Sequence, residues 1–349
     1  SDKKAEKRLA RFKMSRYKNL PSRLLSGGKR TNAAVGWAVP AFALFAAMLF
    51  FTGCASEKNN RPFLEVKAAG LEASGVDAYG SRDYQAALKK FTDALAANRS
   101  VDNRPGELIN LINIGRARIL LGEYDEAVSN LTDAVTLAVG IKDEANLSEA
   151  HATLAKAYSS IGNVANALTE IDAALAIDVK LGRSFGAKLN LKAAIHIAAG
   201  EIPAAKELLK KALKDSLSAE DLTEAANALR LLAAIESAPQ HHGNRASALK
   251  LYERAYEYDK ILGDPFKIAL DLKNMAALNL GEGRAKGVLP PKGVLPPLDA
   301  AFLFERHYTV AMTIGQIEDA LESLKELIKI YTAAQDNKKA EEYTKLRDS

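Results

Sequence analysis

Cysteine is nearly absent from this chain. Cys54 is the single cysteine in 349 residues, so no intramolecular disulfide can hold the fold. The five histidines are scattered, and the adjacent pair His241 and His242 has no third candidate ligand nearby. We therefore predict neither disulfides nor a bound metal, and expect the fold to depend on apolar packing.

Catalytic motifs are also missing. Ser26–Thr31 (SGGKRT) lacks the first glycine of a phosphate-binding loop, and Gly281–Gly287 (GEGRAKG) misses the dinucleotide-binding spacing. No serine or cysteine has the neighbours of an activated nucleophile. The sequence predicts a protein that is not an enzyme and needs no cofactor.

A basic face along the body of the chain is absent as well. Eleven of the 48 Lys and Arg residues precede Cys54, against two acidic residues there, which leaves 37 basic and 41 acidic residues from Cys54 onward. The positive net charge therefore belongs to the N-terminal segment, and the remainder is slightly acidic. Such a charge distribution predicts no nucleic-acid partner.

The N-terminal segment has the order of parts found in secretory signals. Residues 14–30 are basic, Ala33–Phe51 is apolar throughout, and small residues precede Cys54. We expect residues 1–53 to be a signal peptide or membrane anchor with its start near Met14, and residues 54–63 to be a short tether.

The residues Phe51-Thr52-Gly53-Cys54 resemble the lipobox of bacterial lipoproteins, with Phe51 in place of the usual aliphatic residue. The resemblance implies a lipid on Cys54 and a tether to the bacterial envelope. Ala55 after the cysteine favours the outer membrane, facing the periplasm. The alternative is an uncleaved single-pass helix in the inner membrane, since the run from Thr31 to Ser56 is long enough to span a bilayer.

Alanines recur along the rest of the chain with a nearly constant period. The steps between them are 40, 40, 38, 43, 52 and 40 residues, a range that indicates stacked helical repeats. The 52-residue step contains KGVLPP twice, so we expect an inserted loop at 284–298. The recurring residues are Ala87, Ala127, Ala167, Ala205, Ala248, Ala300 and Ala340.

Each period has the pattern of two short antiparallel helices, most clearly in Ser148–Gly182. Small and aromatic residues at matched positions, such as Gly75, Tyr84, Ala87 and Phe91, resemble those of the tetratricopeptide family. The resemblance implies an all-α fold, a right-handed superhelix of about seven helical hairpins over residues 64–349.

Two local expectations accompany this pattern. Gly140, Gly182 and Gly263 are expected to end the longer second helices. His307 stands where other repeats have a small residue, which predicts looser packing there.

The resemblance also implies a partner site, because the first helices of tetratricopeptide hairpins line a groove that holds peptides or helices. Carried onto this chain, the groove positions include a polar, mildly basic stripe: Asn113, Arg116, Lys156, Asn190 and Arg230. The stripe suits a carboxylate or an acidic segment of a partner.

Taken together, the sequence predicts a membrane-tethered, non-catalytic scaffold for a protein or peptide partner. Two alternatives stay open. One is a single-pass transmembrane assembly factor or co-chaperone. The other is a repeat platform for glycan or peptidoglycan, which would need clustered groove aromatics, and the inferred face offers little beyond Tyr79.

Overall fold

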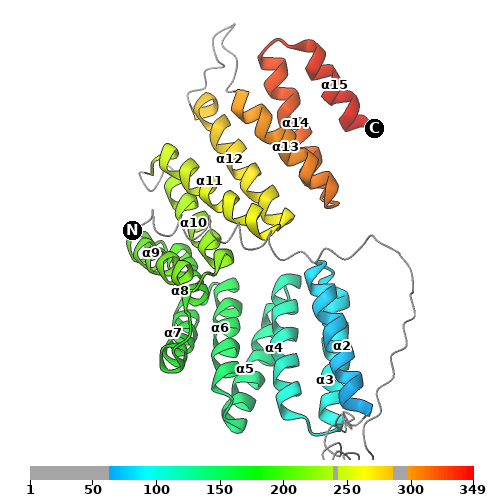
Figure 1. Ribbon diagram of the computed structural model, residues 1–349, viewed down its shortest axis with the longest axis vertical. Coiled ribbons are helices and arrows are strands. Elements are labelled where there is room, and N and C mark those ends of the chain that lie inside the picture. Colours follow the sequence, from blue (N-terminus) through cyan, green and yellow to red (C-terminus); the bar gives the residue numbers. More distant parts are fainter. Residues whose placement is uncertain (1–62, 239–242, 286–297) are drawn as a thin grey trace, which may run out of the picture. The chain divides into compact units, whose positions relative to one another are not determined.

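The structure is a computed structural model that describes residues 63–238, 243–285 and 298–349 (Figure 1). The described residues from Leu64 onward belong to one compact unit. The predicted signal segment, Cys54, His241 and His242 lie outside the described residues, as does most of the predicted inserted loop. Among the helices that the structure does describe, none combines the length and apolarity needed to cross a bilayer.

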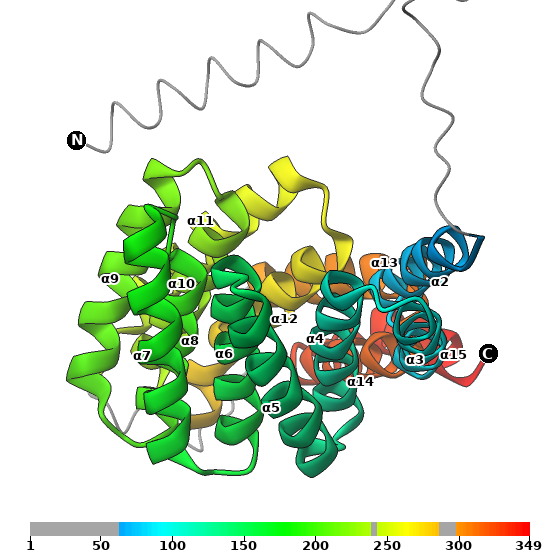
Figure 2. The same ribbon diagram turned by 90° about the horizontal axis from the view of Figure 1, so that it is seen from below.

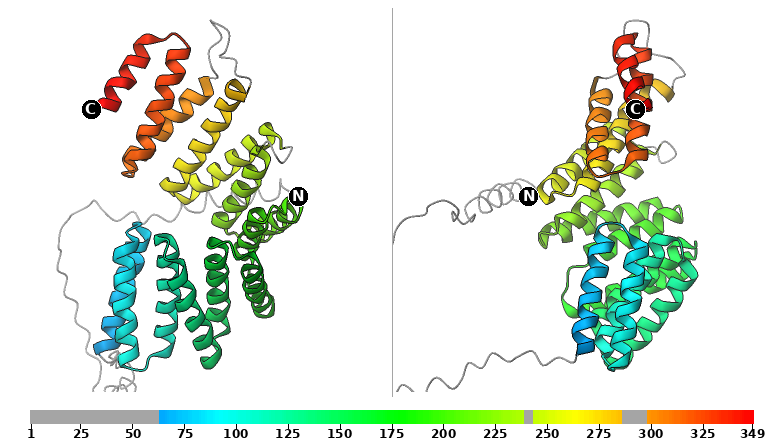
Figure 3. Two further views of the ribbon diagram at one scale, coloured as in Figure 1. Left: turned by 180° about the vertical axis from the view of Figure 1, so that it is seen from behind. Right: turned by 90° about the vertical axis from the view of Figure 1, so that its right-hand side faces the viewer.

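The described residues form fourteen helices and no strands, as the tetratricopeptide resemblance predicts. From residue 84 onward, successive helices pack on one another in chain order. Figure 3 shows this order in two further views, for example from α12 in yellow to α15 in red. The helices pair as α2 (Phe63–Gly80) with α3 (Tyr84–Ser100), α4 (Arg104–Leu121) with α5 (Tyr124–Ile141), α6 (Glu144–Ser160) with α7 (Val164–Leu181), α8 (Gly186–Ala198) with α9 (Ile202–Ser218), α10 (Leu222–Ser237) with α11 (Arg245–Leu262), α12 (Pro265–Ala285) with α13 (Leu298–Thr313), and α14 (Ile317–Ala333) with α15 (Asn337–Asp348).

The recurring alanines lie in the first turn of the second helix of each pair. Six of the seven are fully buried, and Ala340 on the last helix is partly buried. Several pairs also place a small residue against a large one four positions after the alanine, as Gly75 against Phe91 and Ala155 with Ile171. Close approach of the paired helices therefore depends on small residues at fixed positions, which agrees with the spacing in the sequence.

The turns repeat more often than the sequence suggests. Within two residues of eleven helix ends, one residue adopts a left-handed backbone conformation, and the first six of these lie twenty residues apart. A single αL residue after a helix satisfies its last carbonyl groups. The eleven are Arg82, Asp102, Gly122, Lys142, Gly162, Gly182, Gly200, Glu220, Gly263, Gly315 and Gln335.

Two of the three predicted glycine stops are confirmed, because Gly182 and Gly263 cap α7 and α11 in the left-handed conformation. The prediction for Gly140 is wrong. Gly140 lies inside α5, and Lys142 takes the left-handed position with a φ of 59°. The geometry of the turn is fixed by the packing of the next helix, so a lysine adopts it where no glycine is present.

Short polar side chains begin the next helices. Asp or Asn stands directly after the left-handed residue in several turns, and its side chain accepts a hydrogen bond from a backbone N–H in the first turn of the helix. Asp143, for example, accepts from Asn146 N at 3.0 Å. Capping of this kind stabilises each helix start.

The expectation of loose packing at His307 is wrong. The side chain is 2% exposed, and its Nδ1 lies 2.5 Å from Ser323 Oγ on α14. The imidazole fills the space between α13 and α14, and the hydroxyl satisfies its polar atom. Burial lowers the pKa of His307, which keeps the ring neutral at physiological pH.

Candidate functional site

The first helices of successive pairs form a row of their own. Helix α4 packs against α6, α6 against α8, and α8 against α10. Within the described residues no two odd-numbered helices pack on each other to this extent. Seen from below, α7 and α9 lie outside α6 and α8 (Figure 2). We call α4, α6, α8 and α10 the inner row, and the predicted groove residues all lie on it.

Arg116 on α4 is part of an ion-pair network that joins three helices of the inner row. Its Nη2 donates to Glu149 Oε2 on α6 at 2.9 Å, and its Nη1 donates to Asn113 Oδ1 at 3.4 Å. The other oxygen of Glu149 accepts from Lys188 Nζ on α8 at 2.8 Å. One carboxylate thus lies between two cations from neighbouring helices.

Lys188 also reaches the second helix of the preceding pair. Its Nζ lies 2.7 Å from Asp178 Oδ2 on α7, and the Ser148 hydroxyl donates to the other oxygen of Asp178 at 2.7 Å. Asp178 is 1% exposed, so Lys188 compensates a carboxylate that water does not reach. The charge of Lys188 is therefore satisfied inside the fold.

Lys156 on α6 differs from the cations around it. Its side chain is exposed, and it makes no ion pair with any of the described residues. The pKa of Lys156 is lowered, first by loss of hydration between the neighbouring helices and second by the positive charge of Arg116. Solvent reaches the ammonium group, yet the surrounding helices displace part of its hydration shell. An anion placed here would relieve both effects.

Tyr79 on α2 borders the same region. Burial raises the pKa of its phenol, and the nearby charge of Arg116 partly opposes that rise. The ring packs edge-on against Tyr84, with centroids 5.5 Å apart. Tyr79 thus gives an aromatic edge to the cationic region formed by Asn113, Arg116 and Lys156, which we call the basic site.

Asn190 lies on α8 and faces α10. Its amide donates to the backbone oxygen of Glu224 at 2.9 Å and to Glu224 Oε2 at 3.0 Å. The other carboxylate oxygen of Glu224 accepts from Asn227 at 3.1 Å. Asn190 is buried, and its hydrogen bonds join two helices of the inner row.

Arg230 on α10 is enclosed by two carboxylates. Its Nε donates to Asp271 Oδ1 on α12 at 2.7 Å, and its Nη2 donates to Asp259 on α11. Both aspartates are fully buried, and the arginine side chain is 10% exposed. Burial raises the pKa of Asp271 to about 6, and Arg230, which Asp259 also contacts, offsets only part of this rise.

The five predicted groove residues thus fall into two groups. Asn113, Arg116 and Lys156 lie together at the basic site, whereas Asn190 and Arg230 hold consecutive pairs together. Glu149 and Lys188 were not predicted from the sequence, because their partners lie between 10 and 39 residues away and in no fixed sequence relation. Their only signal is a charged residue at a position that helical periodicity assigns to a contact face.

The two other histidines among the described residues pair with carboxylates. His151 Nδ1 lies 2.6 Å from Glu170 Oε2, and His196 Nδ1 lies 2.5 Å from Glu201 Oε2. Within the described residues no three His, Cys, Asp or Glu side chains are grouped as metal ligands.

Comparison with known proteins supports the fold. A Rap protein in complex with Competence and Sporulation Factor superposes with a TM-score of 0.55 over 77% of this chain and 76% of its own, at 13% identity. The apo form of RapI gives 0.52 over 74% and 86%, at 14% identity. No family model matches the sequence, and no curated protein matches it.

A third structure identifies the type of repeat. It is a signal-transduction ATPase of the STAND class with a tetratricopeptide repeat sensor, from Pyrococcus horikoshii. The superposition has a TM-score of 0.59 and 18% identity, and covers 81% of this chain but 40% of the ATPase. The fold of the described residues is therefore of the tetratricopeptide type.

Proposed function

We propose that the repeat region is a non-catalytic scaffold that binds a protein or peptide partner along the inner row. The partner places an acidic group, a side-chain or terminal carboxylate, at the basic site. Asn113 and Tyr79 border this group, and Arg116 and Lys156 supply the charge.

One observation carries the proposal. Of the three cations Arg116, Lys156 and Lys188, Arg116 and Lys188 pair with the carboxylates Glu149 and Asp178, and Lys156 pairs with neither. The surplus positive charge falls on Lys156, on an exposed surface where the pKa of that lysine is already lowered. A binding surface with an uncompensated charge favours a partner of the opposite sign.

The superposed structures are compatible with such a role. A Rap protein of the same fold is complexed with Competence and Sporulation Factor, which gives one case of this architecture holding a partner. Stacked helical pairs leave an extended surface open to ligands, and this surface is what repeat proteins use for recognition.

The test is recovery of partners after crosslinking in membranes. Arg116→Glu/Lys156→Glu should recover them at least about tenfold less than wild type, since two favourable charges become unfavourable. The matched control is Lys89→Glu/Lys214→Glu, which makes the same charge change on exposed lysines of α3 and α9. Equal recovery by both double variants would remove the basic site from consideration.

We further propose that the scaffold is tethered to the bacterial envelope through lipid on Cys54, as the lipobox resemblance implies. Labelling with radioactive palmitate tests this on the full chain and on Cys54→Ala. Incorporation into wild type alone supports the tether. Label that persists without the thiol, or that never appears, rejects it in favour of an uncleaved membrane anchor.

A further inference from the structure

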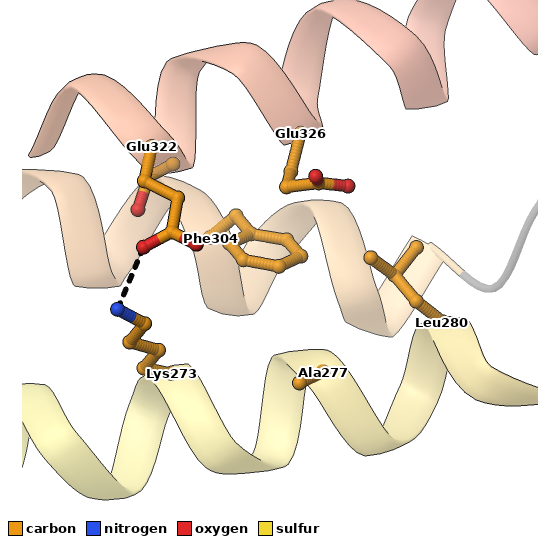
Figure 4. A pocket seen from close by; sticks show the side chains of 7 residues that line it. Lys273, Ala277, Leu280, Phe304, Glu322 and Glu326 are labelled. Atoms are coloured by element: carbon orange, nitrogen blue, oxygen red, sulfur yellow. Dashed lines mark hydrogen bonds and ion pairs between the residues drawn. The ribbon is translucent and has the colours of Figure 1, made fainter. Parts of the chain in front are cut away.

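A recess lies between α12 and α14, away from the helices that carry the basic site. Its volume is about 310 Å³. Lys273, Ala277 and Leu280 line it from α12, Glu322 and Glu326 from α14, and Phe304 of α13 lies between the two walls (Figure 4). The recess thus combines an apolar floor with carboxylates along one wall.

Two carboxylates of α14 share one ammonium group of α12. Lys273 Nζ donates to Asp319 Oδ1 at 2.8 Å and to Glu322 Oε2 at 2.7 Å, so one ammonium serves two carboxylates. The other oxygen of Glu322 accepts no hydrogen bond from the described residues. The Glu322 side chain is 57% exposed, so an incoming group can reach it.

Glu326 lies one helical turn further along the same wall. It pairs with Lys329 at 2.9 Å through an i,i+3 contact, and the Lys329 side chain is 63% exposed. The Glu326 side chain is 16% exposed and has a further contact besides this pair, so the carboxylate that an incoming cation can reach is that of Glu322.

The shape and charge of the recess fit one type of side chain. Lysine and arginine carry an apolar stem and a terminal cation, and they bury the stem while the cation stays near water or a counterion. A stem on Leu280 and Phe304 would bring the cation to Glu322, and the aromatic face would add a favourable cation–π contact. An acidic or purely apolar side chain would leave Glu322 unmatched or be repelled by it.

We infer that the recess between α12 and α14 binds a basic side chain, lysine or arginine, of the protein partner. This inference rests on the proposed function, since it assigns a second contact of opposite charge to the same partner. An acidic group at the basic site and a basic residue at this recess would together fix the direction in which the partner lies.

A random dodecapeptide library displayed on phage tests the inference, panned against the full chain in detergent. Peptides selected by wild type should be enriched in lysine or arginine beside an apolar residue. Panning against Glu322→Gln/Glu326→Gln should remove that enrichment. The matched control is Glu341→Gln/Glu342→Gln, which removes two charges from exposed positions on α15 and should leave the enrichment intact.

A selected peptide then gives a quantitative test. Replacing its lysine by methionine keeps the stem and removes the charge, which should weaken binding to wild type about tenfold, the loss expected for one charge-assisted hydrogen bond. The same replacement should change binding to Glu322→Gln/Glu326→Gln by less than about twofold, because the carboxylates that the lysine contacts are already gone. If the two changes acted independently, the replacement would weaken binding to both proteins equally.

The outcomes separate the two proposals. Peptides that depend on Arg116 and Lys156 but show no basic residue, or that bind Glu322→Gln/Glu326→Gln equally well, overturn the recess and leave the proposed function standing. Loss of enrichment in the α15 control as well would show a general charge effect and also overturn it. Recovery of no peptide at all by wild type would contradict both.

Discussion

Gly115 on α4 lies against Leu131 on α5 so closely that a Cβ atom on the glycine would be 2.5 Å from Leu131 Cγ. The same relation joins Gly75 to Phe91 in the preceding pair. A small residue here lets the two helices approach until the large side chain fills the space over its backbone. The contact sets the distance between the helices of a pair, and it lies next to the inner-row residues Asn113 and Arg116.

Gly115→Ala should therefore destabilise the protein by about 1 to 3 kcal/mol, because the added methyl group forces the leucine or the helices to move. Urea unfolding followed by circular dichroism measures this change. Gly70→Ala is the control, since nothing lies within 4 Å of a Cβ at this helical position. The control should gain up to about 1 kcal/mol from helix propensity, and a loss as large as that of Gly115→Ala would contradict the packing explanation.

The left-handed turns give a second prediction. Lys142 adopts a φ of 59°, at a cost that glycine does not incur. Lys142→Gly should raise the free energy of unfolding by up to about 1 kcal/mol. The reverse change at the equivalent turn, Gly162→Ala, should lower it by about as much, since Gly162 has a φ of 78°. Thermal unfolding of both variants checks the pair, and shifts of the same sign would refute the explanation.

The cations of the inner row should differ sharply in their effect on stability. Lys188→Met removes the partner of Asp178, which is 1% exposed, and should cost about 3 to 5 kcal/mol because a buried carboxylate loses its countercharge. Lys156→Met should change stability by no more than about 0.5 kcal/mol, since that lysine has no ion pair to lose. The urea midpoints of unfolding of the two variants, each compared with wild type, measure these stability changes. Comparable losses would mean that Lys156 also has a structural role.

The carboxyl group of Asp271 should make stability depend on pH. Its pKa is raised from 3.8 to about 6 by burial, so the folded state holds the proton more tightly than the unfolded state does. The resulting stabilisation is complete below about pH 4 and is lost as the pH rises through 6, by about 3 kcal/mol at most for a shift of this size. Urea unfolding across this range should show that decline in wild type.

Asp271→Asn supplies the control, because the amide cannot titrate and still accepts a hydrogen bond from Arg230. Its free energy of unfolding should vary less than that of wild type between pH 4 and 6.5. Parallel pH profiles for the two proteins would show that Asp271 is not the responsible group.

Sequence periodicity was sufficient for the architecture. The alanines from Ala87 to Ala300, with the small residues before them and the large ones after them, predicted helical pairs at the observed positions. Such contacts repeat because the two helices of each pair pack in the same way, so a local sequence pattern predicts them. The left-handed turn at Lys142 was not predicted, because nothing about a lysine in the sequence indicates that packing will place it at a positive φ.

The composition and periodicity of the chain determined that it is a stack of helical pairs, because close packing of helices requires small and large residues at fixed intervals. Only the tertiary structure determined which charged side chains are paired and buried and which are exposed. Arg230 and Lys156 are both cations predicted for one face, yet Arg230 meets Asp271 from 41 residues away and is enclosed, while Lys156 meets no carboxylate. The role of a charged side chain depends on the groups that folding brings beside it, and the sequence separation between them does not follow the repeat period.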